Sequence, residues 1–203
     1  MPPCRQILRN QDRRRWLAWA LGLGSGLVGG LGGTAHSQTS FDTRTRGLAV
    51  LVRHAATEPG IGDPPGYRLD VCSTQRNLSI AGQDQARRLA STLAQAGLVP
   101  TEVMSSHWCR CQDTARLAFG RVSPWRALDS FFDQAEREPA QTAALRTALA
   151  NLAAGQVAVW VTHQVNISAL TGEGTAFGDA VVVQATETNP PGLRVLARLR
   201  TPA

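Results

Sequence analysis

The architecture of this chain follows from the stretch LAVLVRHA at residues 48–55. Five apolar residues, two of them valines, predict a buried strand, and the basic pair Arg53-His54 comes directly after them. Open α/β sheets place their ligand sites at the carboxyl ends of such strands. Two further strand-like runs, Thr101–Met104 and Val157–Trp160, also lead toward basic residues. We therefore expect an anion-binding site where these three strands end.

The rest of the chain alternates helical and extended patterns. We expect helices over Ser79–Ala96, from about Trp108 or Arg110 to Gly120, and over Thr142–Ala154, with further strands at Trp125–Leu128, Val157–Thr162, Ala180–Gln184 and Leu193–Arg200. The segment Leu128–Arg137 is poorly patterned and is expected to be a loop. The last two strands are expected to be antiparallel edge strands. This alternation predicts an α/β domain whose mixed, mainly parallel sheet is covered by helices on both faces.

The first 37 residues do not resemble part of that domain. Arginines precede an apolar, glycine-rich stretch at Trp16–Leu31, and Ala35-His36-Ser37 then supplies a small-x-small cleavage site. This order is typical of a signal peptide, and the apolar stretch is shorter than the roughly 20 residues of a membrane-spanning helix. We therefore expect a signal peptide at residues 1–37 and a domain at 38–203, without a membrane span in the mature chain. The protein should be periplasmic or secreted, and Arg13-Arg14 leaves both the general secretory and the twin-arginine route open.

Removal of this leader would also remove most of the positive charge. The chain carries a net charge of +6, and five arginines against Asp12 assign +4 of it to residues 1–37. The remaining +2 is spread over residues 38–203, without a basic stripe interleaved with aromatic residues. We therefore expect no nucleic acid as a partner.

Three cysteines follow the leader, at positions 72, 109 and 111. An exported protein meets an oxidising compartment, so one disulfide and one spare thiol are expected. Cys109 and Cys111 flank Arg110, and either could pair with Cys72. Such a bridge would tie the loop after the first strand to the arginine segment. The cysteines and histidines lack the paired spacing of a zinc site, so no metal is expected.

Three short motifs occur in a fixed order along the chain. Arg53-His54 comes first, Ser-x-x-x-Arg-x-x-x-Thr-Ala follows at residues 106–115, and Thr162-His163 comes last. Together they resemble the histidine phosphatase (phosphoglycerate mutase-like) superfamily, over roughly Gly47 to Leu170. The resemblance implies a three-layer α/β/α, phosphoglycerate mutase-like fold. Gly62–Gly66 is more similar to lipopolysaccharide-core heptose phosphatase-like members than to the mutases.

The resemblance also assigns roles to individual residues. His54 matches the nucleophile that carries a phosphohistidine, and His163 matches the second histidine, which contacts the transferring phosphoryl group. Arg53 and Arg110 would bind phosphate, because guanidinium groups offer permanent charge and paired donors. Thr57 matches a small hydroxyl residue that could add a hydrogen bond.

Two further positions are open to either a pocket role or an ordinary one. Arg76 could line the pocket or simply lie at a helix entry, while His107 has no counterpart in the motifs and is expected in a loop or at the surface.

A phosphatase also needs an acid to protonate the departing alkoxide. The segment after the arginine helix offers several carboxylates, and Asp129, after the expected strand, is the first choice. Asp133 is the second choice and Glu58 a third possibility. The sequence therefore predicts a cofactor-free phosphatase that acts on a small-molecule or glycan phosphomonoester. The alternative is a noncatalytic phosphate- or phosphosugar-binding protein of the same fold.

Overall fold

The computed structural model describes residues 41–60, 62–188 and 192–202, so the expected signal peptide lies outside the described residues. Within them, the strands are β1 (Leu48–Arg53), β2 (Glu102–Ser105), β3 (Ser123–Pro124), β4 (Val157–Thr162), β5 (Ala180–Ala185) and β6 (Leu193–Leu199). The helices are α1 (Ile80–Gln95), α2 (Cys109–Phe119), α3 (Glu138–Ala150) and α4 (Gln164–Thr171), with short 3₁₀ turns at Cys72–Thr74, Arg126–Leu128 and Ala135–Arg137. No helix among the described residues is long and apolar enough to cross a membrane.

The strands form one sheet in the order β3-β2-β4-β1-β5-β6. Neighbours from β3 to β1 run parallel, whereas β5 is antiparallel to β1 and β6 is antiparallel to β5. The predicted mixed, mainly parallel sheet is confirmed. In the parallel pair of β1 and β4, Arg53 lies opposite Thr162, so the residues that follow them, His54 and His163, leave the sheet side by side.

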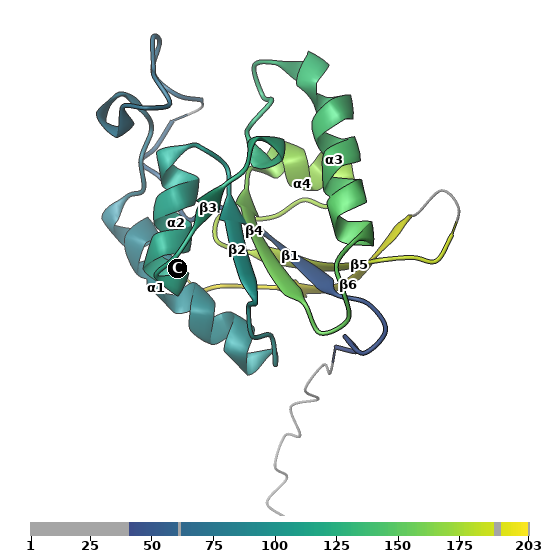
Figure 1. The fold of residues 1–203 in the computed structure, drawn as a ribbon. Helices are drawn as coiled ribbons and strands as arrows, with labels where there is room; N and C mark the ends of the chain where they lie inside the picture. Colours follow the sequence, from purple (N-terminus) through teal and green to yellow (C-terminus); the bar gives the residue numbers. More distant parts are fainter. Residues whose placement is uncertain (1–40, 61, 189–191, 203) are drawn as a thin grey trace, which may run out of the picture. The chain divides into compact units, whose positions relative to one another are not determined.

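The central strands are buried on both faces of the sheet, and helices cover each face. Leu48, Val50 and Val52 of β1 pack into one apolar cluster with residues of α1 and α2. Ala49 and Leu51, which point to the opposite face, pack into a second cluster with residues of α3 and α4. Because side chains alternate across a strand, a strand buried on both faces needs apolar residues at every position. Figure 1 shows the resulting layers, with α1 and α2 on one side of the sheet and α3 and α4 on the other.

The segment at residues 125–128 differs from its prediction. The expected strand Trp125–Leu128 is instead a 3₁₀ turn at Arg126–Leu128, and only Ser123–Pro124 pairs with β2. The chain turns because the Leu128 N–H bonds to the carbonyl of Trp125, and this turn buries Leu128 against the α3 side of the sheet. The apolar residues of this segment are therefore explained by their burial in a turn, and no strand is needed to account for them.

Three other elements also differ from their predictions. α3 begins at Glu138 rather than Thr142, because Pro139 fits the first helical turn, where its missing N–H is not needed. β5 lies between β1 and β6, so it is not an edge strand. α4 was not predicted, because its eight residues include β-branched and polar types that favour helix weakly, although Gly172 ends it in the left-handed conformation.

The loop between β1 and α1 is attached to the start of α2. Cys72 and Cys109 form a disulfide, as expected of Cys72, and Cys111 is a free, buried thiol. Beside the disulfide, the Gln75 Oε1 accepts a hydrogen bond of 3.0 Å from the Cys109 N–H. The side-chain amide therefore caps a helix whose own N-cap residue, Trp108, makes no side-chain cap bond. Figure 1 shows this loop running beside α2.

Replacement of Cys72 by serine should lower the melting temperature. The bridge spans 37 residues, and closing a loop of that length stabilises a domain by about 3 to 4 kcal/mol in the chain-entropy model. Thermal unfolding followed by circular dichroism, with and without reductant, measures the effect. Reductant should lower the melting temperature of the wild type and of Cys111→Ser, but hardly that of Cys72→Ser. A melting temperature of Cys72→Ser equal to that of the oxidised wild type would contradict this account.

Candidate active site

A cavity of about 330 Å³ opens at the carboxyl ends of β1 and β4. Its lining includes Arg53, His54, Arg110 and His163, four residues that the sequence predicted for one site, together with Arg76. Residues from the loop after β1, the start of α2, the loop before α3 and the segment before β5 complete the wall. The edge of the sheet where the strands end has therefore gathered two histidines and three arginines into one pocket.

His54 is held by its backbone and by one ring nitrogen. Its N–H bonds to the carbonyl of Thr162 at 3.0 Å, and its own carbonyl accepts from the Gly178 N–H at 3.1 Å. The Nδ1 atom lies 2.9 Å from the Ala55 carbonyl oxygen, which can only accept a hydrogen bond. Nδ1 therefore carries the proton in the neutral ring, and the lone pair is on Nε2.

Burial sets the protonation state of His54. The side chain is almost fully buried, and this desolvation, followed by the nearby charge of Arg110, lowers the pKa of His54 to about 3. The sequence analysis expected arginines near this histidine, but the larger cause is burial itself. A neutral imidazole with an unprotonated Nε2 is the form that can act as a nucleophile.

The segment after His54 is fixed by two polar side chains from the helices. The Ala55 N–H donates to Thr114 Oγ1 at 3.0 Å, and the Ala56 N–H donates to Gln85 Oε1, also at 3.0 Å. Thr114 is one helical turn after Arg110, so the Arg-x-x-x-Thr spacing fixes both the arginine and the backbone beside His54. α1 also approaches closely, since a Cβ at Gly82 would lie 1.8 Å from the Ala56 carbonyl oxygen.

The three arginines of the cavity are each anchored at the tip of the guanidinium. Arg53 Nη1 donates to the Thr175 carbonyl at 2.7 Å, and its Cζ lies 3.9 Å from the centre of the Phe177 ring. Arg76 Nη1 donates to the carbonyl of Gly60. In all three arginines the Nε atom is buried and has no hydrogen-bond partner among the described residues. Buried donors without partners are rare in proteins, so these three are consistent with a site that receives an anion.

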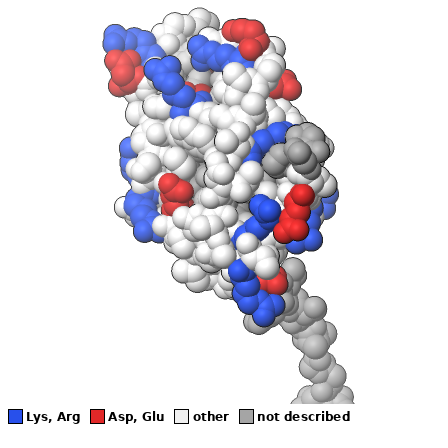
Figure 2. All heavy atoms as spheres, turned by 45° about the vertical axis from the view of Figure 1, so that its right-hand side comes forward, with Lys and Arg blue, Asp and Glu red and all other residues white. Residues whose placement is uncertain are grey.

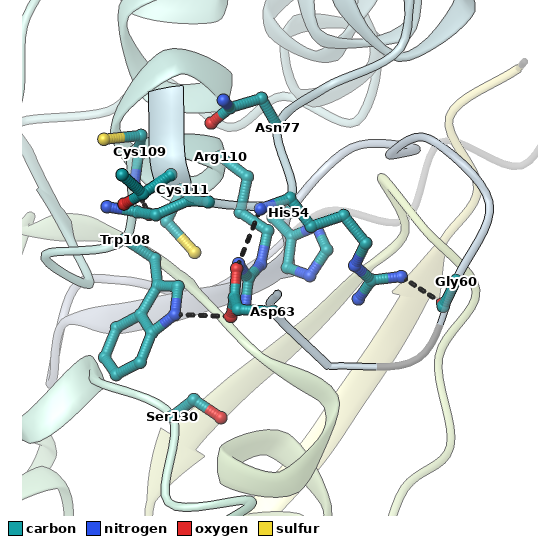
Figure 3. Close-up of polar contacts among 12 residues, drawn as sticks. His54, Gly60, Asp63, Asn77, Trp108, Cys109, Arg110, Cys111 and Ser130 are labelled. Atoms are coloured by element: carbon teal, nitrogen blue, oxygen red, sulfur yellow. Dashed lines mark hydrogen bonds and ion pairs between the residues drawn. The ribbon is translucent and has the colours of Figure 1, made fainter. Parts of the chain in front are cut away.

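Arg110 is paired with an acidic residue that the sequence analysis did not assign to the site. Its Nη1 lies 2.8 Å from Asp63 Oδ1 and 3.1 Å from Oδ2, and both side chains are buried. Figure 3 shows Asp63 between Trp108 and Arg110, with His54 beside the guanidinium. Asp63 was missed because a phosphate site calls for positive charge, and the surrounding Gly62–Gly66 segment was interpreted only as a similarity to one phosphatase subgroup.

His163 faces His54 and is held from behind. The two ring centres are 5.4 Å apart. His163 Nε2 lies 2.9 Å from Ser106 Oγ, and Ser106 Oγ lies 3.2 Å from Asp129 Oδ1. Because the Asp129 carboxylate accepts the Ser106 hydroxyl proton, the Ser106 oxygen is left to accept from His163. Burial, followed by the charge of Arg110, lowers the pKa of His163 well below its usual range.

Part of the sequence around this site matches a known protein family. A model of the histidine phosphatase superfamily (branch 1) matches residues 49–133, from β1 to the loop before α3. This part of the chain, residues 49–133, is therefore similar in sequence to the histidine phosphatase superfamily. Among curated proteins, no match is found. The matched segment contains the Arg-His pair and Arg110 but ends before His163, which the sheet register brings to the same site.

Solved structures share the fold of this chain at low sequence identity. Mycobacterial glucosyl-3-phosphoglycerate phosphatase aligns with a TM-score of 0.56 and 18% identity, over 74% of this chain and 97% of that one. An Escherichia coli K-12 protein, proposed to be an alpha-ribazole-5'-P phosphatase, aligns with a TM-score of 0.53 and 17% identity. The alignment covers 74% of this chain and 96% of that one. The protein histidine phosphatase SixA complexed with tungstate aligns with a TM-score of 0.51 and 15% identity, over 76% of this chain and 97% of that one. These likenesses confirm the predicted phosphoglycerate mutase-like fold.

Two residues predicted for the histidine phosphatase site do not line the cavity. Asp129 lies behind Ser106, and its carboxylate also accepts from the N–H of His107 at 2.7 Å. Its carboxylate reaches His163 only through the Ser106 hydroxyl, and its expected role as leaving-group acid stays a prediction. Thr57 is buried and has no hydrogen-bond partner for its Oγ1 among the described residues, but it lies outside the lining.

The other acid candidates are placed differently. Asp133, the second choice of the sequence analysis, lines the cavity, whereas Glu58 is exposed and does not. His107, expected in a loop, lies 3.0 Å from Asp129 through Nδ1 and is outside the lining.

Among the described residues, no three His, Cys, Asp or Glu side chains are grouped as a metal site. On the face shown in Figure 2, arginine and acidic side chains are interspersed.

The buried histidines should make stability depend on pH. Below about pH 6.5 the unfolded chain binds a proton at His54, whereas the folded chain, with a pKa of about 3, does not. The free energy of unfolding should therefore fall as the pH is lowered from about 6.5 toward 3, by up to about 2 kcal/mol per such histidine between pH 6.5 and 5. Denaturant titrations at both pH values test this. His54→Gln should lose less stability than the wild type over this interval, and equal losses would contradict a buried, neutral His54.

Proposed function

We propose that this protein is an exported phosphatase that hydrolyses a phosphomonoester through a phosphohistidine on His54. The observation that carries the proposal is the shared cavity, in which a neutral His54 with a free Nε2 lies beside three arginines whose Nε–H groups have no partner among the described residues. The match of residues 49–133 to the histidine phosphatase superfamily supports phosphatase chemistry at this place. The substrate is proposed to be a small molecule or a glycan, because the cavity holds only about 330 Å³.

The first step would transfer the phosphoryl group to the protein. Arg53, Arg76 and Arg110 hold the nonbridging oxygens, and His54 Nε2 attacks phosphorus while the bond from phosphorus to the ester oxygen breaks. His163, 5.4 Å from His54 between ring centres, lies where it can contact the transferring group. Charge on the equatorial oxygens is stabilised by groups already in place, which is the main source of catalysis in phosphoryl transfer.

The leaving oxygen would take its proton from Asp133. Of the carboxylates considered for this role, Asp133 lines the cavity. Asp63 also lines it, but hydrogen bonds from Arg110 and from the Arg76 N–H outweigh its burial and lower its pKa, so it stays ionised. In the second step, Asp133 takes a proton from water, the water oxygen attacks phosphorus, and the bond to His54 breaks to release phosphate. No cofactor enters either step.

The proposal of export is supported by the signal-peptide pattern and by the disulfide. The signal-peptide pattern at residues 1–37 predicts passage out of the cytoplasm, and a disulfide such as Cys72–Cys109 persists in an oxidising compartment. We propose a periplasmic or secreted location on these two grounds.

Replacement of His54 by alanine should lower kcat for 4-nitrophenyl phosphate by several orders of magnitude, because it removes the group that forms the covalent bond. Arg87→Ala serves as the control, since Arg87 is an exposed residue of α1 that pairs with Asp84. Circular dichroism should show both variants folded. Retention of more than about a tenth of wild-type turnover by folded His54→Ala contradicts the mechanism. A wild type that binds phosphate without turnover would favour the noncatalytic alternative.

A further inference from the structure

Asp63 is the charged group of the cavity that the proposed mechanism leaves without a task. Its Oδ1 accepts hydrogen bonds from Arg110 Nη1 at 2.8 Å and from the Arg76 N–H at 2.9 Å. Its Oδ2 accepts from Trp108 Nε1 at 2.9 Å. The side chain of Asp63 is only 6% exposed and lines the same cavity as His54. A carboxylate with this many donors is fixed in position, so its negative charge is a permanent part of the pocket.

This charge changes what the arginines can bind. Arg110 has one end of its guanidinium paired with Asp63, while its Nε is buried without a partner among the described residues. The transferring phosphate takes the donors that remain on the three arginines. A second anionic group on the substrate would find those donors occupied and would lie near the carboxylate of Asp63. Like charges in a partly buried site repel strongly, so such a substrate would bind poorly.

The remainder of the wall includes four aromatic residues among small and polar ones. Tyr67, Trp108, Phe132 and Phe177 all line the cavity. Phe132 is 60% exposed, which is unusual for so large an apolar side chain, and Trp108 is almost fully buried. Aromatic walls with a few fixed polar groups favour flat or apolar ligands. The cavity therefore combines arginines near the nucleophile with an aromatic surface for the leaving group.

We infer that Asp63 is a specificity-determining residue, and that the substrate is a phosphomonoester whose aromatic or apolar leaving group carries no second negative charge. This inference rests on the proposed function, because it concerns the same cavity. Asp63 selects by exclusion: its carboxylate uses part of the positive charge of Arg110 and repels an added anion. The aromatic residues supply the contacts that favour the accepted leaving group.

A pair of nearly isosteric substrates tests the charge selection. 4-Carbamoylphenyl phosphate and 4-carboxyphenyl phosphate differ mainly by one negative charge on the leaving group. The wild type should show a kcat/KM for the amide at least about tenfold above that for the carboxylate. In Asp63→Asn, which keeps the shape and one acceptor oxygen, this ratio should shrink several-fold. Asp70→Asn is the control, because Asp70 lies in the same loop, is exposed, pairs with Arg68 and is outside the cavity.

The ratio within each variant does not depend on how much active protein is present, so a general loss of activity in Asp63→Asn does not obscure the result. Equal efficiencies in the wild type, or a preference for the carboxylate, would overturn the inference while leaving the proposed function intact. An unchanged ratio in Asp63→Asn would remove Asp63 as its cause, and Asp63→Ser repeats that test if the asparagine variant does not fold. Failure of the wild type to hydrolyse either compound would instead count against the proposed function.

The aromatic part of the inference has its own measurement. Phe132→Ala should lower kcat/KM more for phenyl phosphate than for ethyl phosphate, because only the aryl leaving group loses a ring contact. Phe132 is mostly exposed, so the variant should fold. Equal losses for both substrates would show that the leaving group does not contact this ring.

Discussion

The parallel pairing of β1 with β4 is the constraint from which the site follows. Arg53 lies opposite Thr162 in this pair, so His54 and His163 emerge at the same level although they are far apart in the sequence. A shift of one residue in the register would turn both apolar faces of β1 over and separate the two histidines. The alternating clusters on the two faces of the sheet therefore stabilise the fold and also place the histidines together.

The groups around the histidines are held by polar side chains that bridge separate elements. Gln85 joins the backbone after His54 to the carbonyl of Phe177, through hydrogen bonds of 3.0 and 2.8 Å. The disulfide of Cys72 and the hydrogen bond from Cys109 N–H to Gln75 attach the first loop to α2, and this loop carries Asp63. A charged pocket needs such support, because its groups stabilise a transition state only when they are already held in the right positions.

The sequence predicted the elements with strong local signals. β1 and β4 have unbroken apolar runs, and α1 has its serine cap, so their positions were predictable from pattern alone. The motifs indicated Arg53, His54, Arg110 and His163 from the sequence. The first two and His163 lie at or directly after the ends of β1 and β4, whereas Arg110 lies in the first turn of α2. Asp63 was not predictable, since its partner Arg110 is 47 residues away and loop conformation decides their contact. The position of Asp129 behind Ser106 was not predictable either. It depends on the 3₁₀ turn at Arg126–Leu128, where the apolar pattern had predicted a strand.

The account depends most on a covalent bond between phosphorus and His54. Rapid acid-free quenching of the wild type during turnover, followed by peptide mapping by mass spectrometry at neutral to alkaline pH, tests it directly. The account predicts one phosphoryl group on the peptide that contains His54, base-stable and acid-labile, and none on that peptide in His54→Ala. Turnover without a phosphorylated peptide, or a phosphoryl group carried by another residue, would contradict it.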